Sequence, residues 1–361
     1  MNTSKLTLTH AKYLIIQQKM IGDVLTSSIL CEAIKKKNPN AEVHFLVNQH
    51  TIPVIENHPY IDKMVVFTKE VEKSTAKFFQ FLQQIKKEHY DVVIDVYSKP
   101  ASTLIGKFSG AALKIGYQKW YTKLAYNELY TYKAKAETQA GLAIENRMHL
   151  LQSLDKSYAK ELKPKIYLTE AEIASAKKIL QQENLADKDL LMIGVLGSSE
   201  EKSYPLPYLA KVLDTIVKTT DAGLLFNYIP KQLTTVQKLV NLCEPETQKR
   251  IHLSIYGKSL RDFMALTSLC KAFIGNEGGA VNMAKALNVP TFSIFAPFTK
   301  RAAWALYENA SNVSVHLEDY QPETYGELSL KEIRKGASKY YQSFKAEYFL
   351  EKLKNYLKEV L

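Results

Sequence analysis

Short apolar runs alternate along the chain with longer segments in which apolar residues recur every three or four positions. In the first half, the apolar runs predict strands at residues 13–17, 41–47, 63–67, 91–96 and 113–116. The periodic segments between them predict helices at residues 23–37, 51–57, 74–88 and 102–108. Strands and helices in this alternation are typical of parallel βαβ units in a doubly wound sheet.

A less regular stretch rich in Tyr and Lys, residues 117–165, precedes a second alternation. It should hold one helix, at 137–154, and end in an interdomain connection near Lys163-Pro164. Beyond it, the pattern predicts strands at 190–196, 224–228, a short one starting at Phe273, and 291–295. Helices are predicted at 171–182, 207–219, 231–243, 260–269 and, as a long basic tail, 331–361.

The expected architecture is therefore α/β, with two tandem Rossmann-like domains of doubly wound parallel sheet facing a cleft. Residues 1–164 would form the first domain and residues 165–361 the second, whose last helix is free to pack back on the first. In such folds, ligands bind at the carboxyl ends of the strands. The length of 361 residues agrees with two domains of ordinary size.

Composition narrows the class of protein. A formal net charge of +11 suits an acidic partner. No RNP, helix-turn-helix or zinc-finger pattern occurs, so we do not expect nucleic acid. Three isolated cysteines fit a reducing cytosol. Met1–Lys12 lacks the apolar core of a signal peptide, and no segment is apolar enough to span a bilayer. We expect a cytoplasmic protein that would meet a membrane as a peripheral protein, from its surface.

A glycine-rich turn between a strand and a helix of small residues is the first candidate site. It contains Glu277, Gly278 and Gly279, and its helix carries Asn282. Glycine lets the backbone approach a ligand, and a helix N-terminus offers N–H groups and the positive end of its dipole. A phosphate and a sugar hydroxyl would suit this turn. A tight turn that binds nothing is the alternative, and the stretch alone leaves both open.

Other polar residues follow predicted strands. Asp23 could take a proton from an attacking hydroxyl, or simply cap its helix. The loop with Ser198, Ser199 and Lys202 suits a phosphate, or is a solvated loop. Ser98 and Lys99 follow the fourth strand, where a lysine could hold an acidic acceptor or merely solvate the surface.

Several motifs are absent or uninformative. No GxxxxGK[ST] occurs, and no GxGxxG follows the first strand, which disfavours a nicotinamide-dependent oxidoreductase. Asp187-Lys188-Asp189 precedes a strand, and the histidines form no cluster, so we expect no metal and no cofactor. The basic tail helix is either an ordinary surface helix or a membrane contact.

Four stretches resemble, in the same order, the glycosyltransferase family that includes the lipopolysaccharide heptosyltransferases (glycosyltransferase family 9). They are Ile21–Leu25, Tyr90–Asp95, Leu113–Tyr117 and Phe273–Pro290. The resemblance covers roughly Lys12 to Pro297. It implies a GT-B fold that binds the acceptor mainly on the first domain and a nucleotide-sugar donor on the second. It further implies an inverting, metal-independent transfer of heptose from ADP-heptose to an anionic glycolipid acceptor of the lipopolysaccharide core.

The same resemblance implies roles for individual residues. Asp23 would be the general base, and Lys19 would lie near a basic position of the acceptor site. The donor diphosphate would meet Ser198, Ser199 and Lys202 together with the N–H groups of Gly278 and Gly279, while Glu277 would reach the ribose. The family has Asp, Ser or Thr, Gly and then His where this chain has Glu277, Gly278, Gly279 and Asn282. Two functions stay open: a glycosyltransferase, or a catalytically silent GT-B relative that binds a glycan or nucleotide sugar.

Overall fold

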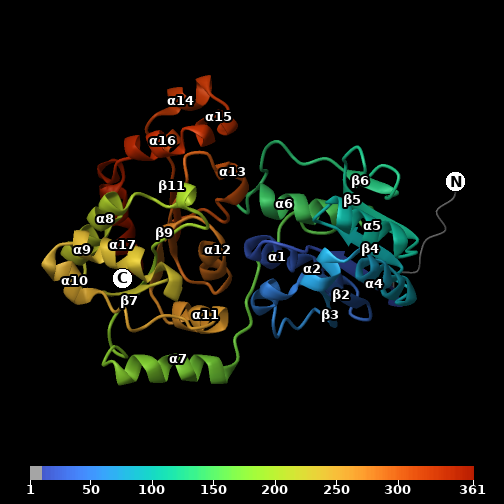
Figure 1. Ribbon diagram of the computed structural model, residues 1–361, viewed down its shortest axis with the longest axis horizontal. Coiled ribbons are helices and arrows are strands. Elements are labelled where there is room, and N and C mark those ends of the chain that lie inside the picture. Colours follow the sequence, from blue (N-terminus) through green and yellow to red (C-terminus); the bar gives the residue numbers. More distant parts are fainter. Residues whose placement is uncertain (1–9) are drawn as a thin grey trace. The chain divides into compact units, whose positions relative to one another are not determined.

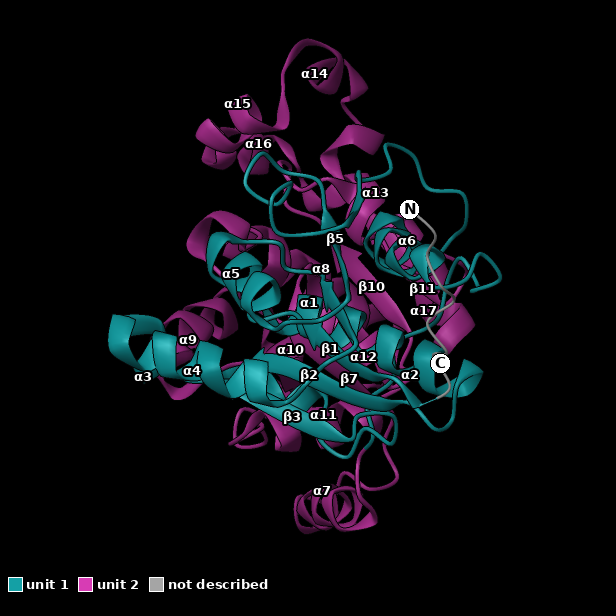
Figure 2. Cartoon of the chain, turned by 90° about the vertical axis from the view of Figure 1, so that its right-hand side faces the viewer, with its two compact units in different colours: residues 1–167 teal, residues 168–361 magenta. Residues whose placement is uncertain are grey.

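The computed structural model describes residues 10–361, which form two compact units (Figure 1, Figure 2). The first unit ends at Tyr167 and the second runs from Leu168 to Leu361. The sequence places this boundary after residue 164, a few residues earlier. The absence of a signal-peptide core was argued on the first twelve residues, of which the first nine lie outside the described part.

The first unit contains a six-stranded parallel sheet. Its strands are β1 (Lys12–Ile16), β2 (Glu42–Asn48), β3 (Lys63–Phe67), β4 (Val92–Asp95), β5 (Leu113–Tyr117) and β6 (Glu128–Tyr130). They lie in the order β3-β2-β1-β4-β5-β6, every pair parallel. This is the strand order of a Rossmann sheet. The α/β prediction is confirmed for this unit.

Helices pack on both faces of this sheet. They are α1 (Ile21–Ser27), α2 (Ile29–Lys37), α3 (Lys69–Lys73), α4 (Thr75–Lys87), α5 (Pro100–Phe108) and α6 (Leu142–His149), with short 3₁₀ turns at Gln49–Val54 and Leu150–Ser153. Leu14 and Ile16 share one core cluster with residues of α4 and α5. Tyr13 and Ile15 point to the other face and are equally buried. Burial on both faces explains why β1 is a continuous apolar run.

Three helices of the first unit differ from the prediction, and the one expected at 51–57 is a 3₁₀ turn at Gln49–Val54. The helix expected at 23–37 begins at Ile21 and is interrupted at Ser28, whose hydroxyl donates to the carbonyl oxygen of Leu25 at 2.8 Å. The helix expected at 137–154 begins at Leu142. The Glu145 carboxylate accepts the backbone N–H groups of Glu137 and Thr138, which holds the preceding residues in a turn rather than in helix.

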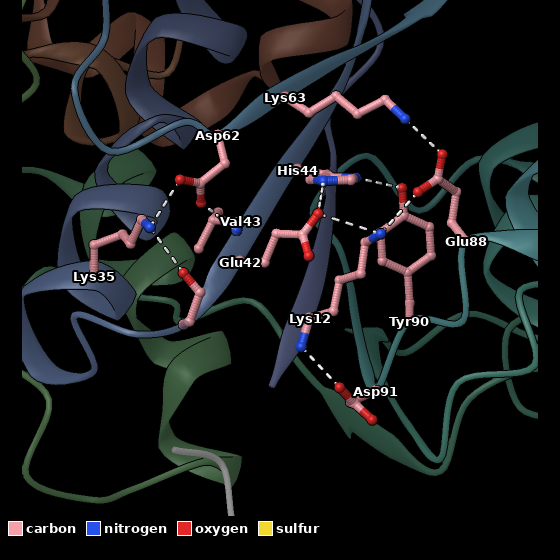
Figure 3. A network of polar contacts seen from close by, with 11 residues as sticks. Lys12, Lys35, Glu42, Val43, His44, Asp62, Lys63, Glu88, Tyr90 and Asp91 are labelled. Carbon is pink, nitrogen blue, oxygen red and sulfur yellow. Dashed lines mark hydrogen bonds and ion pairs between the residues drawn. The ribbon is translucent and has the colours of Figure 1, made fainter. Parts of the chain in front are cut away.

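The amino ends of the strands are closed by ion pairs (Figure 3). Lys12 Nζ lies 2.8 Å from a Glu88 oxygen and 3.2 Å from a Glu42 oxygen. His44 bridges Glu42 and the hydroxyl of Tyr90, at 2.7 and 2.9 Å. Because these groups satisfy one another, this edge of the sheet serves stability.

The second unit contains a five-stranded parallel sheet. Its strands are β7 (Leu190–Gly194), β8 (Gly223–Phe226), β9 (Ala272–Asn276), β10 (Thr291–Ile294) and β11 (Asn312–Val315), in the order β11-β10-β9-β7-β8. Its helices are α7 (Glu170–Gln182), α8 (Leu206–Thr219), α9 (Leu233–Leu242), α10 (Pro245–Arg250), α11 (Leu260–Ser268), α12 (Gly279–Ala286), α13 (Arg301–Trp304), α14 (Pro322–Glu327), α15 (Leu330–Lys335), α16 (Ala337–Ser343) and α17 (Leu350–Val360), with 3₁₀ turns at Glu200–Lys202, Pro230–Gln232, Leu317–Asp319 and Ala346–Tyr348. This is also a doubly wound sheet, so the predicted fold class is confirmed for both units.

The basic tail is not one helix, as predicted, but three helices and a 3₁₀ turn. Gly336 ends α15, and the chain bends again at Phe344 before α17. Leu353, Tyr356 and Leu357 of α17 belong to the core of the second unit, and α17 packs on α8. The apolar face of the last helix is therefore used inside its own unit. Among residues 10–361, no helix is long and apolar enough to cross a membrane.

Candidate functional site

Each sheet has a point where the strand order reverses, and ligands of doubly wound folds bind at the carboxyl ends of the strands there. In the first unit this point lies between β1 and β4, where Ile16 pairs with Asp95. In the second unit it lies between β7 and β9, where Gly194 pairs with Gly275. The predicted site residues fall in the loops and helices that follow these strands. Each half of the site is built within its own unit.

Asp23 lies in the first turn of α1 and does not cap that helix. Met20 occupies the N-cap, and within the described residues no side chain caps α1. The Asp23 carboxylate instead accepts a hydrogen bond from a terminal nitrogen of Arg147 at 2.7 Å. About a quarter of the Asp23 side chain is exposed, against 8% for Arg147. Asp23 is thus a partly exposed carboxylate held by a buried guanidinium.

Arg147 itself is held by several groups. Its Nε donates to the Ser27 hydroxyl at 2.9 Å, and its other terminal nitrogen donates to the carbonyl oxygen of Ala143 at 2.6 Å. These bonds leave the guanidinium little freedom to turn. The sequence analysis missed Arg147, because it lies more than a hundred residues after Asp23 and in no motif that we recognised. No local signal could have paired the two.

Ser98 differs from its predicted role as an acceptor ligand. It is fully buried with φ +44°, and its hydroxyl donates to the carbonyl oxygen of Asp95 and accepts the N–H of Tyr117. Its carbonyl oxygen accepts from Lys119 Nζ at 2.7 Å and from the Tyr121 hydroxyl at 3.0 Å. Ser98 therefore shapes the loop, and the exposed neighbour Lys99 is the group that this loop presents.

Asp95 is the buried anchor of that loop. Its carboxylate accepts the N–H of Ser98 and the hydroxyls of Ser102 and Tyr126. Complete burial raises its pKa to about 6, and the hydrogen bonds from Tyr126, Ser98 and Ser102 oppose that rise. A carboxylate with three donors and no exposure fixes geometry; it does not meet a ligand. The sequence showed Asp95 only as the end of an apolar strand.

Lys19 and Lys99 line one cavity of about 430 Å³ in the first unit. Tyr97, Glu72 and Phe78 contribute to the same walls, and Lys19 is ion-paired with Glu72. A second hollow of about 440 Å³ shares Lys19, Phe67 and Glu72 and adds residues of the loop after β2. Together they give the carboxyl edge of this sheet room for a sizeable polar ligand with an anionic group.

The glycine-rich turn of the second unit brings together two predicted donor residues. Glu277 is 6% exposed, and its Oε1 accepts from Lys202 Nζ at 3.1 Å and from the Thr299 hydroxyl at 2.9 Å. Lys202 comes from the loop after β7 and Glu277 follows β9. A loop lysine is therefore held over the turn by a buried carboxylate. Thr299 was not foreseen, because nothing in its own sequence context marks it.

The backbone of the turn depends on glycine at two positions. Gly275 has φ +143°, and a Cβ there would lie 2.3 Å from the carbonyl oxygen of Gly194. Gly278 has φ +147° and faces open space, with no atom within 4 Å of a Cβ built on it. Asn276 ties the turn to the loop after β7 by donating to the carbonyl oxygens of Gly194 and Val195, each at 2.9 Å.

The N-terminus of α12 has no side-chain cap among the described residues. Gly278 is the N-cap of this eight-residue helix. Asn282 lies on its second turn and is buried. The N-terminus of α12 thus presents backbone N–H groups and the positive end of a helix dipole beside Lys202.

Ser198 and Ser199 lie in a different part of the second unit's surface. They are exposed and line a cavity of about 560 Å³, with Gly197, Tyr204 and Gln232 among its other walls. The backbone N–H of Lys202 donates to the carbonyl oxygen of Ser199, so the two serines and the lysine belong to one folded loop. Lys202 points to Glu277, while the serines face the cavity beside the N-terminus of α8.

Candidate metal ligands do not gather in the described residues. No group of three or more His, Cys, Asp or Glu side chains among residues 10–361 is placed to hold a metal ion. Asp189 of the Asp187-Lys188-Asp189 triplet precedes β7 and lies 3.4 Å from Lys271. The triplet is thus a turn at the amino end of the sheet.

Two Rossmann-like units with polar loops at both strand-order reversals are typical of GT-B glycosyltransferases. The sequence profile of glycosyltransferase family 9 (heptosyltransferase) matches residues 78–332. The chain belongs to this family, and it is a glycosyltransferase.

Individual relatives are distant in sequence but match over most of their length. Lipopolysaccharide heptosyltransferase 1 of Campylobacter coli is 23% identical over 322 residues, covering 84% of this chain and 88% of that protein. The crystal structure of a family 9 glycosyltransferase from Veillonella parvula gives a TM-score of 0.71 at 17% identity, covering 94% of this chain and 99% of that one. The ADP-heptose lps heptosyltransferase II of Escherichia coli gives 0.65 at 14% identity, covering 92% and 99%. These structures share the fold.

Proposed function

We propose that this protein transfers heptose from ADP-heptose to a lipopolysaccharide-core acceptor, with inversion at the anomeric carbon and without a metal ion. The observation that carries the proposal is the meeting of Lys202, Glu277 and the open glycine turn at the strand-order reversal of the second unit. Family membership supports it, as do the relatives named for heptose transfer to lipopolysaccharide and for ADP-heptose.

In this reaction the acceptor hydroxyl attacks the anomeric carbon from the face opposite the leaving nucleoside diphosphate. Asp23 takes the hydroxyl proton as the new C–O bond forms and the bond from the anomeric carbon to the phosphate oxygen breaks. Arg147 keeps the carboxylate of Asp23 in one orientation by donating to its Oδ1, and Oδ2 would receive the proton. ADP leaves with the electron pair.

The donor site stabilises the charge that develops on the diphosphate. Lys202 exchanges its contact with Glu277 for a phosphate oxygen, and the N–H groups of Gly278 and Gly279 point to the other phosphate oxygens. Glu277 then accepts from the ribose. Asn282 is buried on α12, and Ser198 and Ser199 line the neighbouring cavity on the loop of Lys202, so their assignment to the donor rests on the family resemblance. Fixed donors aimed at the leaving group lower the barrier without reorganisation.

The acceptor binds in the first unit. Lys19 and Lys99 hold the anionic part of the acceptor in the cavity at the carboxyl ends of β1 and β4. Since a lipopolysaccharide precursor is a glycolipid, the protein works on the cytoplasmic face of a membrane as a peripheral protein. The net charge of +11 favours such an anionic surface.

A thermal-shift screen tests the donor. A ligand that binds the folded state alone stabilises it by about 2.7 kcal/mol at one hundred times its dissociation constant. We expect ADP and ADP-sugars to raise the melting temperature, and UDP and GDP to have little effect. Protection by UDP or GDP without protection by ADP would remove ADP-heptose from the proposal.

Replacing Asp23 by Asn tests the base. The amide is nearly isosteric but cannot take the proton, so transfer should fall by at least about a hundredfold while protection by ADP is retained. Asp155→Asn is a control, because Asp155 is an ion-paired carboxylate of the same unit that lines neither acceptor cavity. Unaltered turnover of Asp23→Asn would exclude Asp23 as the base. Protection by ADP with no transfer by the unmodified protein would favour the catalytically silent relative.

A further inference from the structure

Residues 96–127 form a basic segment within the first unit. Five lysines, at positions 99, 107, 114, 119 and 123, occur in it without a single Asp or Glu. The segment covers α5, β5 and the loop that leads to β6, which lie together at one end of the sheet (Figure 1). A run of 32 residues with five positive charges and none to neutralise them creates a local positive potential.

The loop between β5 and β6 exposes two large apolar side chains in the same segment. Leu124 is 88% exposed and Trp120 is 85% exposed, the two highest values among the exposed large apolar residues described. Leu104 and Phe108, four residues apart on α5, are 42% and 48% exposed. Single exposed apolar residues are ordinary, but Trp120 and Leu124 stand four residues apart in one short loop of a basic segment.

The exposure of Trp120 and Leu124 is built into the loop. The hydroxyl of Thr122 donates to the carbonyl oxygen of Tyr117 at 2.9 Å and accepts the backbone N–H of Lys119 at 2.8 Å. Ala125 and Tyr126 are buried, and the Tyr126 ring fills the space beside Gly106 and Gly116. Thr122, Ala125 and Tyr126 are thus held inward, and Trp120, Lys123 and Leu124 are held outward.

The loop is also tied to the acceptor cavity. Lys119 Nζ and the Tyr121 hydroxyl both donate to the carbonyl oxygen of Ser98. The next residue, Lys99, lines the cavity. A surface that contacts this loop therefore lies close to the acceptor site, because the loop is hydrogen-bonded to the residue that precedes Lys99.

We propose that Trp120 and Leu124, with the exposed Lys123 between them, dock the protein on an anionic lipid bilayer. Lys123 meets the headgroups, and the indole and the leucine side chain enter the boundary below them. The proposal rests on the proposed function in placing the acceptor in that membrane, but its test measures vesicle binding and needs no substrate. The loop takes the place of the basic tail as the expected membrane contact, because the apolar face of the tail's last helix is buried in the second unit.

The positive charge and the side-chain types of this surface favour a lipid bilayer as its binding partner. Trp is the residue most suited to the boundary between headgroups and acyl chains, and each lysine near an anionic leaflet adds attraction. A second copy of this chain would bring the same lysines against one another, and like charges would oppose that contact.

Vesicle flotation tests the surface. We expect the protein to float with vesicles of phosphatidylcholine and phosphatidylglycerol, and much less with phosphatidylcholine alone. The double variant Trp120→Ser/Leu124→Ser should bind the anionic vesicles at least about tenfold more weakly. Leu233→Ser/Leu242→Ser is the matched control, because it removes two exposed leucines of the second unit, at 45% and 50% exposure. Equal binding by the wild type and the first double variant would overturn the proposal.

Tryptophan fluorescence supplies a second readout on the folded protein. The chain has two tryptophans, so Trp304→Phe leaves Trp120 as the only reporter. Its emission should shift to shorter wavelength when anionic vesicles are added, and added salt should reverse the shift. An unchanged Trp120 spectrum on bound vesicles would overturn the proposal. So would a wild type that self-associates through this loop, loses that association in the Trp120→Ser/Leu124→Ser variant and does not bind vesicles.

Discussion

Arg147 is the residue whose role follows most directly from its contacts. It holds Asp23, Ser27 and a backbone carbonyl of its own helix at once, with 8% of its side chain exposed. A lysine cannot make these contacts together, because it offers one point charge instead of a planar fork. Asp23 would then turn away from the position from which it takes a proton.

We therefore predict that Arg147→Lys and Arg147→Ala both lower kcat, by about a hundredfold, while KM for the donor changes little. Steady-state kinetics on the purified variants would measure this split. Arg250→Ala is a suitable control, since Arg250 pairs with the exposed Asp221 in the second unit. A loss confined to KM for the donor would contradict a positioning role.

Asp95 predicts a pH dependence of stability. Its pKa rises from an ordinary 3.8 to about 6 on folding, because the carboxyl group is fully buried. Between these values the folded state carries more protons than the unfolded state, so the free energy of unfolding falls as the pH rises. We compare the free energy of unfolding of the wild type with that of Asp95→Asn. The difference, wild type minus variant, should fall by up to about 3 kcal/mol between about pH 4 and 7. Chemical denaturation across that range measures it.

Tyr126→Phe provides the comparison for Asp95. It keeps the ring that packs beside Gly106 and Gly116 but removes a hydrogen bond to the ionised carboxylate. The pKa of Asp95 should rise further, so stability should go on falling to higher pH than in the wild type. Identical pH profiles of the wild type and both variants would show that Asp95 does not titrate on folding.

At this scale the sequence identified side chains but not their partners. Asp23, Lys202 and Glu277 could be named because each stands just beyond an apolar run. Arg147 and Thr299 could not, because their partners lie 124 and 22 residues away and no periodicity connects them. Ser98 was assigned to the wrong surroundings, since a polar residue after a strand can point inward as well as outward.

Among the elements, the turn from β9 into α12 carries the most demanding backbone. Gly275→Ala would place a methyl group 2.3 Å from the carbonyl oxygen of Gly194, at a φ of +143°. We expect a loss of about 2–4 kcal/mol in the free energy of unfolding, measured by denaturant titration. Gly326→Ala in α14 is the control: nothing lies within 4 Å of its Cβ, and its effect should be neutral to slightly stabilising.

Two elements that differ from the sequence prediction do so for separate physical reasons. β6 has three residues, Glu128–Tyr130, and none is fully buried, so it leaves no apolar run to detect. The tail looks like one helix because its apolar spacing continues through breaks at Gly336 and Phe344. A central strand such as β7, which lies between β9 and β8 and is buried throughout, can be recognised by its apolar run.

For the whole molecule, we predict which of the two units binds ADP. Hydrogen exchange should slow most in the second unit, at residues 197–203 and 277–282, because these loops carry the proposed diphosphate contacts. Mass spectrometry of peptides with and without ADP measures this. Slowing confined to the first unit, around Asp23 and Lys99, would reverse the proposed assignment of donor and acceptor.

The two-unit architecture was the most predictable level of the molecule. Alternating strands and helices restart after a break, and each series forms its own parallel sheet with its own core. The pattern predicts this because burial on both faces of a parallel sheet demands nearly continuous apolar strands. It cannot predict which loop residues meet at the strand ends, since those contacts depend on the geometry of several loops at once.

The contact between Lys202 and Glu277 has a consequence for selectivity. In the proposed donor site Lys202 already pairs with the Glu277 carboxylate, so an incoming phosphate would have to compete with that carboxylate for the lysine. A neutral sugar has no negative charge with which to replace the carboxylate as the partner of Lys202. A monophosphate carries less negative charge than a diphosphate. The Glu277 carboxylate would thus compete with the ligand for Lys202, and ligands with too little negative charge would not bind.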